Sequence, residues 1–152
     1  MRCLLFLSLS LVVGAVSLSG CKQTKEIESA KASAKQSLGD FKAEVVRLQA
    51  SASAVRARFK ALPEDLPGIE ETRSMLFSVE EVLGVEGARG EWLAGEVNTA
   101  SKTGKKEQIQ KISDEIRGAI RGNKGLEKAI LKVAGQLLPF ERMAGERRDA
   151  GR

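Results

Sequence analysis

The chain has 152 residues, a formal net charge of +5, and neither histidine nor tyrosine. Without histidine it lacks the commonest general base and the commonest metal ligand, so we expect no enzyme, no catalytic residue, no cofactor and no metal site. Alanine, glutamate, lysine, leucine and arginine dominate and only three prolines occur, which is typical of long helices.

The first segment has the pattern of an export signal. One arginine precedes an apolar stretch at residues 3–18, which is shorter than the about 20 apolar residues of a membrane span but has the length of a secretory signal. It ends in Leu18-Ser19-Gly20-Cys21. An apolar residue, two small residues and a cysteine at this place resemble the lipobox of bacterial lipoproteins. A transmembrane anchor that is never cleaved is the alternative.

The resemblance implies a lipid anchor. A signal peptidase would recognise the three residues before Cys21 and cleave there, and Cys21 would carry acyl chains on its sulfur and its amine. Two or three such chains hold a protein stably at a membrane. By the same resemblance Lys22, where an aspartate would retain the protein at the inner membrane, favours the outer membrane and a periplasmic location. The mature chain of about 130 residues then has no second cysteine and no internal disulfide.

The first helix is predicted by a heptad seam. Its apolar residues follow one another at alternating steps of four and three: Ala34, Leu38, Phe41, Val45, Leu48, Ala52, Val55, Phe59 and Leu62. This spacing predicts a helix from about Lys25 to Ala61. Pro63 ends it, and residues 62–68 read as a tight connection.

A second seam occupies residues 68–100. Its members are Ile69, Thr72, Leu76, Val79, Leu83, Glu86, Gly90, Leu93, Val97 and Ala100. Gly84, Gly87 and Gly90 weaken the middle of this helix, because each glycine costs about 1 kcal/mol relative to alanine. We therefore expect a kink or a short break within residues 84–90.

A turn at residues 98–104 leads to the third seam. Its members are Ile109, Ile112, Ile116, Ala119, Asn123, Leu126, Ile130, Val133 and Leu137. Asn123 is either a buried, register-fixing residue with an asparagine or serine partner, or a solvated residue at a bend made by Gly122 and Gly125. Pro139 is expected to end the helix and to leave residues 139–152 as a charged, disordered tail.

Three patterns of 34–37 residues joined by short turns predict an all-α fold, an antiparallel up-down-up three-helix bundle over residues 27–138. Residues 1–20 would be the lipoprotein signal and residues 21–26 an acylated tether. Four or five shorter helices, broken at the glycines, are the alternative.

Charge alternates between the predicted helices. Residues 22–61 have a net charge of +5, residues 64–96 of −7 and residues 102–132 of +5. The densest basic cluster lies in the third segment: Lys102, Lys105, Lys106, Lys111, Arg117, Arg121, Lys124, Lys128 and Lys132. We favour pairing of these cations with the acidic second helix. A surface for anionic lipid or cell-wall polymer is the alternative. Nucleic acid is not expected, because no aromatic residues for base stacking lie among the cations.

Two adjacent carboxylate pairs, Glu70-Glu71 and Glu80-Glu81, lie outside the seam. Their members point in different directions on a helix, so we interpret them as a solvated face. The expected function is that of a non-enzymatic, lipid-anchored envelope protein with a structural role or an envelope protein partner. A binding module for anionic lipid or cell-wall polymer, using basic helices 1 and 3, is the alternative.

Overall fold

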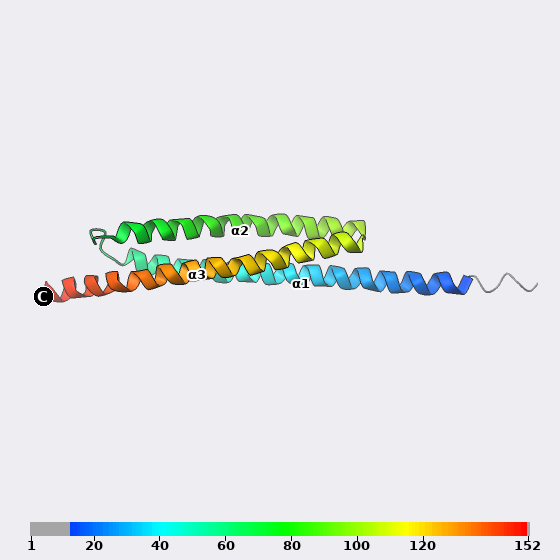
Figure 1. The fold of residues 1–152 in the computed structure, drawn as a ribbon, viewed down its shortest axis with the longest axis horizontal. Helices are drawn as coiled ribbons and strands as arrows, with labels where there is room; N and C mark the ends of the chain where they lie inside the picture. The colour runs from blue at the N-terminus through cyan, green and yellow to red at the C-terminus, as the bar shows by residue number, and fades with distance from the viewer. Residues whose placement is uncertain (1–12, 152) are drawn as a thin grey trace, which may run out of the picture.

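The fold consists of three long helices. The computed structural model describes the backbone of residues 13–151 and the side chains of residues 22–151. The helices are α1 (Val13–Lys60), α2 (Ile69–Thr103) and α3 (Lys106–Ala150), and each packs against the other two. Figure 1 shows an elongated up-down-up bundle in which α1 and α3 run parallel and α2 runs antiparallel to both. The predicted all-α three-helix bundle is confirmed.

The heptad seams form the core. The largest side chains that are fully buried all come from them: Phe41, Leu48, Ile69, Leu93, Ile109, Ile116, Leu137 and Val133. The seam positions that looked anomalous in α2 are also inward, with Thr72 and Gly90 buried and Glu86 half-buried. A spacing of three and four therefore identified the inner face of every helix, even where the residue was polar or had no side chain.

The core is divided into two clusters along the bundle. One contains Phe41 and Leu93 near the α2–α3 turn, and the other contains Leu48 and Leu137 towards the α1–α2 connection. We call the end with the α2–α3 turn the basal end and the opposite end the distal end. Glu86 and the buried Asn123 lie between the two clusters in the heptad order of their helices.

The break expected within residues 84–90 is wrong, because α2 is continuous from Ile69 to Thr103. Phe41 of α1 explains one of these glycines. A Cβ atom at Gly90 would lie 3.3 Å from Cε1 of Phe41, whose side chain is completely buried. Gly90 thus permits a close approach of α1 and α2, and the packing outweighs the low helix propensity of glycine.

The two connections use glycine in the left-handed region. Gly68 has φ 81° before α2 and Gly104 has φ 64° after it, a conformation that costs other residues about 1–2 kcal/mol. The predicted connection over residues 62–68 is confirmed, whereas the turn predicted over residues 98–104 is confined to its end, because α2 continues to Thr103. Leu62 and Leu66 of the first connection are buried against the distal cluster, so this connection closes the distal end of the core.

The expected helix end at Pro139 and the disordered tail are also wrong, since α3 contains Pro139 and continues to Ala150. Proline removes the hydrogen bond to the carbonyl four residues earlier, but Gly135 and Pro139 are both exposed, so water can satisfy that carbonyl. The last turns are held by the core, because Ala144 is buried and Phe140 packs against the same cluster.

The three helices are unequal, with 48, 35 and 45 residues. Consequently α1 extends beyond the α2–α3 turn at the basal end, and α3 extends beyond the α1–α2 connection at the distal end (Figure 1). Residues 21–26, expected as a tether, belong to α1. The segment around Cys21 therefore leads into the bundle as a helix.

Candidate functional site

The four residues that resemble a lipobox lie in the first turns of α1. Leu18, Ser19, Gly20 and Cys21 fall within the helix Val13–Lys60, but their side chains lie outside the described residues. Acylation of Cys21 and recognition by a signal peptidase stay predictions. Residues 1–12 of the predicted signal lie outside the described backbone.

Directly after Cys21 a groove lined mainly by polar residues opens between α1 and α3. It has a volume of about 490 Å³, and we call it the basal groove. Its lining residues are Lys22, Lys25, Glu26, Ser29, Ala30, Ser33, Lys106, Gln110, Ser113 and Arg117. The groove exists because α1 and α3 are parallel and α3 begins level with Glu26, so the first turns of α3 lie beside α1 at the point where its overhang begins (Figure 1).

One ion pair crosses the basal groove. Nζ of Lys106 donates to Oε2 of Glu26 at 2.8 Å. This hydrogen bond lowers the pKa of the Glu26 carboxyl and raises the pKa of the Lys106 ammonium. Both side chains are exposed enough for solvent to screen them, so the pair fixes the geometry of the groove rather than the stability of the fold.

The other cations of the groove have no strong carboxylate partner. Nη2 of Arg117 donates to Oγ of the buried Ser113 at 2.9 Å, while its distance to Asp114 is 3.8 Å. Lys22 and Lys25 form no ion pair among the described side chains. Ammonium, guanidinium and hydroxyl donors around one groove are the groups that bind phosphate or carboxylate oxygens.

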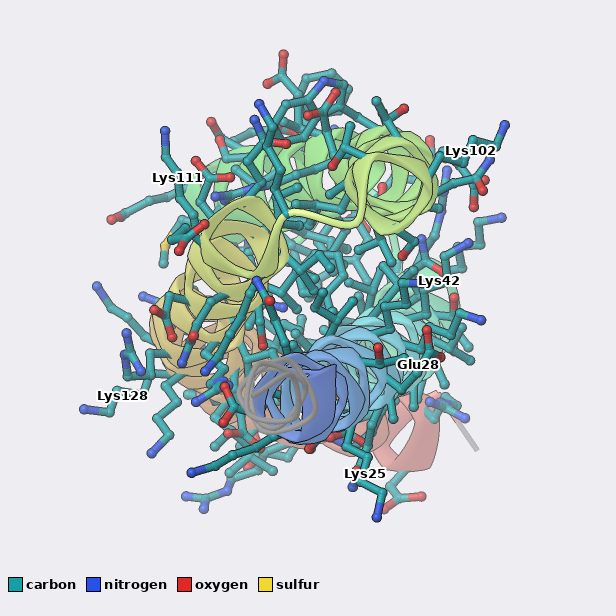
Figure 2. All side chains as sticks on the ribbon, turned by 90° about the vertical axis from the view of Figure 1, so that its right-hand side faces the viewer. Lys25, Glu28, Lys42, Lys102, Lys111 and Lys128 are labelled. Atoms are coloured by element: carbon teal, nitrogen blue, oxygen red, sulfur yellow. The ribbon has the colours of Figure 1, made fainter. Side chains whose placement is uncertain are left out.

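The structure separates the predicted basic cluster into several places. Lys105 precedes α3 at the basal turn, and Lys106 is paired with Glu26. In Figure 2, which looks along the bundle from the basal end, Lys111 and Lys128 project in different directions, with Lys111 nearer to α2. The remaining predicted residues, Arg117, Arg121, Lys124 and Lys128, are exposed and follow one another at heptad steps along α3.

Ion pairs between helices all involve α1 or the connection that follows it. Lys42 and Arg56 of α1 pair with Glu91 and Glu80 of α2, and Arg47 and Arg58 pair with Glu127 and Glu141 of α3. No pair joins α2 to α3 among the side chains of residues 22–151. The interpretation that the acidic second helix neutralises the cations of the third is therefore wrong.

Several cations of α3 therefore have no ion-pair partner within the described part of the bundle. Over the part of the chain whose side chains are described, Arg121, Lys124, Lys128 and Lys132 have no carboxylate within 4.0 Å. Of the predicted carboxylate pairs, Glu70, Glu71 and Glu81 are exposed as expected, whereas Glu80 is half-buried and pairs with Arg56. Glu70 pairs with Arg73.

Asn123 is buried, with 3% of its surface exposed, and α3 is continuous past it. The bend that was the other interpretation is absent. The asparagine or serine partner of the first interpretation is also absent, because Nδ2 of Asn123 has no hydrogen-bond partner. It lines a shallow groove of about 370 Å³ between α2 and α3 together with Glu86. Oε2 of Glu86 is likewise buried and unpaired, while its other oxygen lies 3.5 Å from Arg89.

Sequence reasoning missed a set of exposed apolar residues. Phe77, Val85 and Trp92 lie on the outer face of α2 with 67%, 63% and 54% of their surface exposed. Leu131 and Leu138 are similarly exposed on α3. The sequence did contain a signal for the outer surface of α3. Leu131 and Leu138 lie seven residues apart and continue the heptad spacing of the basic residues, outside the seam.

Comparison with protein-family models, with curated proteins and with solved structures finds no match for this chain. Over the described residues no helix has an apolar stretch long enough for a bilayer crossing. In the same residues no group of acidic or cysteine side chains is arranged to hold a metal ion.

Proposed function

We propose that the protein is a lipid-anchored lipoprotein of the bacterial cell envelope, with a non-enzymatic structural or protein-interaction role. The observation that carries the proposal is the lipobox sequence Leu18 to Cys21 at the start of a helix that runs into the bundle without interruption. An acylated Cys21 would thus be joined to the bundle by a rod rather than by a flexible linker. The outer membrane, facing the periplasm, is the proposed location.

The charge distribution along the bundle supports attachment to the membrane through the basal end. The basal segments, residues 22–35 and 99–111, contain eight lysines and three glutamates. The distal segments, residues 56–73 and 136–151, contain seven basic and seven acidic residues. Membrane surfaces that carry anionic lipid attract basic segments placed within about a Debye length. The lipobox therefore lies at the end of the molecule whose charge suits such a surface.

A second candidate function is the binding of an anionic lipid headgroup or an anionic cell-wall polymer in the basal groove. The unpaired Lys22 and Lys25 beside Arg117 favour it, since they leave donors for phosphate oxygens. The groove adjoins Cys21, so anchoring and headgroup binding would reinforce each other at the same surface.

Substitution of Cys21 tests the anchor. We expect Cys21→Ser, expressed in the native host, to leave an unprocessed precursor without acyl chains, as measured by mass spectrometry. Cys3→Ser is the matched control, because Cys3 lies in the predicted signal and its loss should leave normal acylation. Maturation of the Cys21→Ser chain, or an unmodified Cys21 in the natural chain, contradicts the proposal.

A further inference from the structure

The outer face of α2 carries an exposed apolar stripe that contains one carboxylate. It consists of Phe77, Glu81, Val85, Ala88 and Trp92, all exposed and spaced by three or four residues. Large apolar side chains that are more than half exposed and grouped on one helix face mark interaction sites. We call this surface the α2 stripe.

The outer face of α3 carries a stripe of opposite charge. It begins with Arg117, Arg121, Lys124 and Lys128 and continues to Leu131 and Leu138. The steps alternate between four and three except for the last, which is a full heptad, so these residues face one direction. We call this surface the α3 stripe.

The two stripes carry charges of opposite sign, with one carboxylate on the α2 stripe and four cations on the α3 stripe, and over the described residues only Arg117 of these cations has a carboxylate within 4.0 Å. Glu81 has no cation within 4.0 Å among the described side chains, and Arg121, Lys124 and Lys128 have no carboxylate. One chain cannot join its own stripes, because both lie on outer faces while α2 and α3 pack through their seams. The α3 stripe of another copy of the same chain, in contrast, offers a cation for Glu81 and exposed leucines for the apolar residues of the α2 stripe.

The residues of the two stripes also lie at corresponding heights. The tight turn at Gly104 and the groove shared by Glu86 and Asn123 fix the level of α2 against α3. From these points the rise of 1.5 Å per residue in both helices places Glu81 level with Lys128. The same counting places Trp92 level with Arg117, and Phe77 level with Leu131.

We propose that the α3 stripe of a second copy docks on the α2 stripe. The proposal rests on the acyl anchor for its geometry, because two copies held at Cys21 in one membrane share their orientation and their height. Residues at the same level then meet: Glu81 with Lys128, Phe77 with Leu131, and the Trp92 ring with the Arg117 guanidinium. An exposed tryptophan beside arginine supplies a cation–π contact and a typical interface anchor.

The contact joins two different surfaces, so it is heterologous. Each copy keeps a free α3 stripe on one side and a free α2 stripe on the other. Such contacts repeat until a ring closes or a row forms in the membrane plane.

Cysteine crosslinking in the native envelope tests the contact. Two versions of the full chain, Glu81→Cys and Lys128→Cys, are expressed together and oxidised. We expect a crosslinked dimer from the mixture, and at least about tenfold less from either variant alone. A dimer as abundant from Glu81→Cys alone overturns the heterologous arrangement, and the absence of a dimer from the mixture overturns the contact.

The chain without added cysteines separates this proposal from the anchor. An acylated Cys21 cannot form a disulfide, so the natural chain should give no dimer. A disulfide in the natural chain contradicts cleavage or acylation and leaves the contact between the stripes open to test. The two introduced cysteines are then tested in a chain that carries both Cys3→Ser and Cys21→Ser, so that no natural thiol takes part.

Charge reversal and truncation provide the second measurement. In the mixture, Trp92→Ala and Lys124→Glu should each lower the crosslinked fraction about tenfold or more. Trp92→Ala removes a large side chain from the contact, and Lys124→Glu introduces a charge of the same sign as Glu81. The thermal melts should stay unchanged because both side chains are exposed. Val46→Ala, an equally exposed apolar residue on α1, is the control. An equal loss with Val46→Ala, or no loss with Trp92→Ala, overturns the proposal.

Discussion

At the scale of single residues, the layer that contains Asn123 and Glu86 is an unfavourable place in the bundle. Each has a buried polar atom without a hydrogen-bond partner, which costs about 1–3 kcal/mol relative to a satisfied group. The two residues lie in one shallow groove on different helices. A polar layer of this kind penalises sliding of α3 along α2, because any other register would bury these groups among apolar side chains.

Replacement of Asn123 tests this cost. We expect Asn123→Leu to raise the free energy of unfolding by about 1 kcal/mol, because it removes an unpaired amide and its side chain can occupy part of the groove. Urea unfolding followed by circular dichroism measures the change. Asn98, the only other asparagine, is exposed, so Asn98→Leu should change stability by less than about 0.5 kcal/mol. A destabilised Asn123→Leu chain would show that the amide is satisfied.

The pair of Arg58 and Glu141 fastens the distal part of α3. Nε and Nη2 of Arg58 donate to the two carboxylate oxygens at 2.8 and 3.0 Å. This hydrogen bonding lowers the pKa of Glu141 below its ordinary value of 4.5 and raises the pKa of Arg58. A carboxyl with a lowered pKa stabilises the fold above its ordinary value and loses this contribution as the pH falls through the lowered one.

Stability against pH tests that linkage. Glu141→Gln should lower the free energy of unfolding at pH 7 by about 1 kcal/mol or less, since both side chains are about one third exposed and solvent screens them. The difference from the natural chain should shrink as the pH falls below 4.5. Glu146→Gln, on an exposed residue of the same turns, is the control. A difference that is constant down to strongly acidic pH would exclude the ion pair as its cause.

At the scale of helices, the glycines of α2 have different roles. Gly84 is exposed and a Cβ atom there would meet nothing within 4 Å, whereas one at Gly90 would press on Phe41 at 3.3 Å. Both residues lie within one continuous helix. Helix propensity favours alanine at both positions by about 1 kcal/mol, but packing opposes it at Gly90 only.

The matched pair of alanine substitutions separates these effects. We expect Gly84→Ala to raise the free energy of unfolding by about 0.5–1 kcal/mol. Gly90→Ala should gain nothing or lose stability, because Phe41 is completely buried and cannot shift freely. Equal gains in thermal or urea unfolding would contradict the close approach of the two helices at Gly90.

Most of the fold was readable from the seams, because burial of one face at every third or fourth residue determines which side of each helix is inward. Two local rules failed for one reason. Pro139 disfavours helix, yet the packing of Phe140 and Ala144 keeps α3 helical past it. The glycines at 84–90 also disfavour helix, yet α2 stays helical there, where Gly90 packs against Phe41. These contacts join residues distant in the chain, which local patterns do not reveal.

The candidate site was less predictable. The basic residues of α3 were identified, but not their distribution over the basal groove and the α3 stripe, which share Arg117, because that depends on how far α3 is rotated about its axis. Which cations pair with carboxylates also depends on neighbouring helices. The exposed apolar residues of α2 could not be separated from core residues by composition alone.

At the scale of the whole molecule, the positive charge is concentrated at one end. If the basal groove binds anionic headgroups, the purified mature chain should bind vesicles with anionic lipid more strongly than neutral vesicles, in a sedimentation assay. Binding should weaken as salt increases, because screening shortens the reach of exposed charges. Lys22→Glu with Lys25→Glu should lower it further.

The distal Lys60→Glu is the control for this measurement, since Lys60 ends α1 at the opposite end of the bundle. An equal effect of the distal substitution would show that net charge, rather than the basal groove, governs binding. Binding that does not respond to salt would exclude the electrostatic interpretation.

The overhang of α3 beyond the α1–α2 connection gives the molecule a reach that a bundle of equal helices would lack. Because Lys106 lies level with Glu26, the distance along the bundle axis from Cys21 to the end of α3 corresponds to about 49 helical residues, or roughly 75 Å. With fatty chains at one extremity, a fluorophore attached at the other would stand that far above the lipid. The chain would then act as a stiff spacer that sets a separation in the envelope.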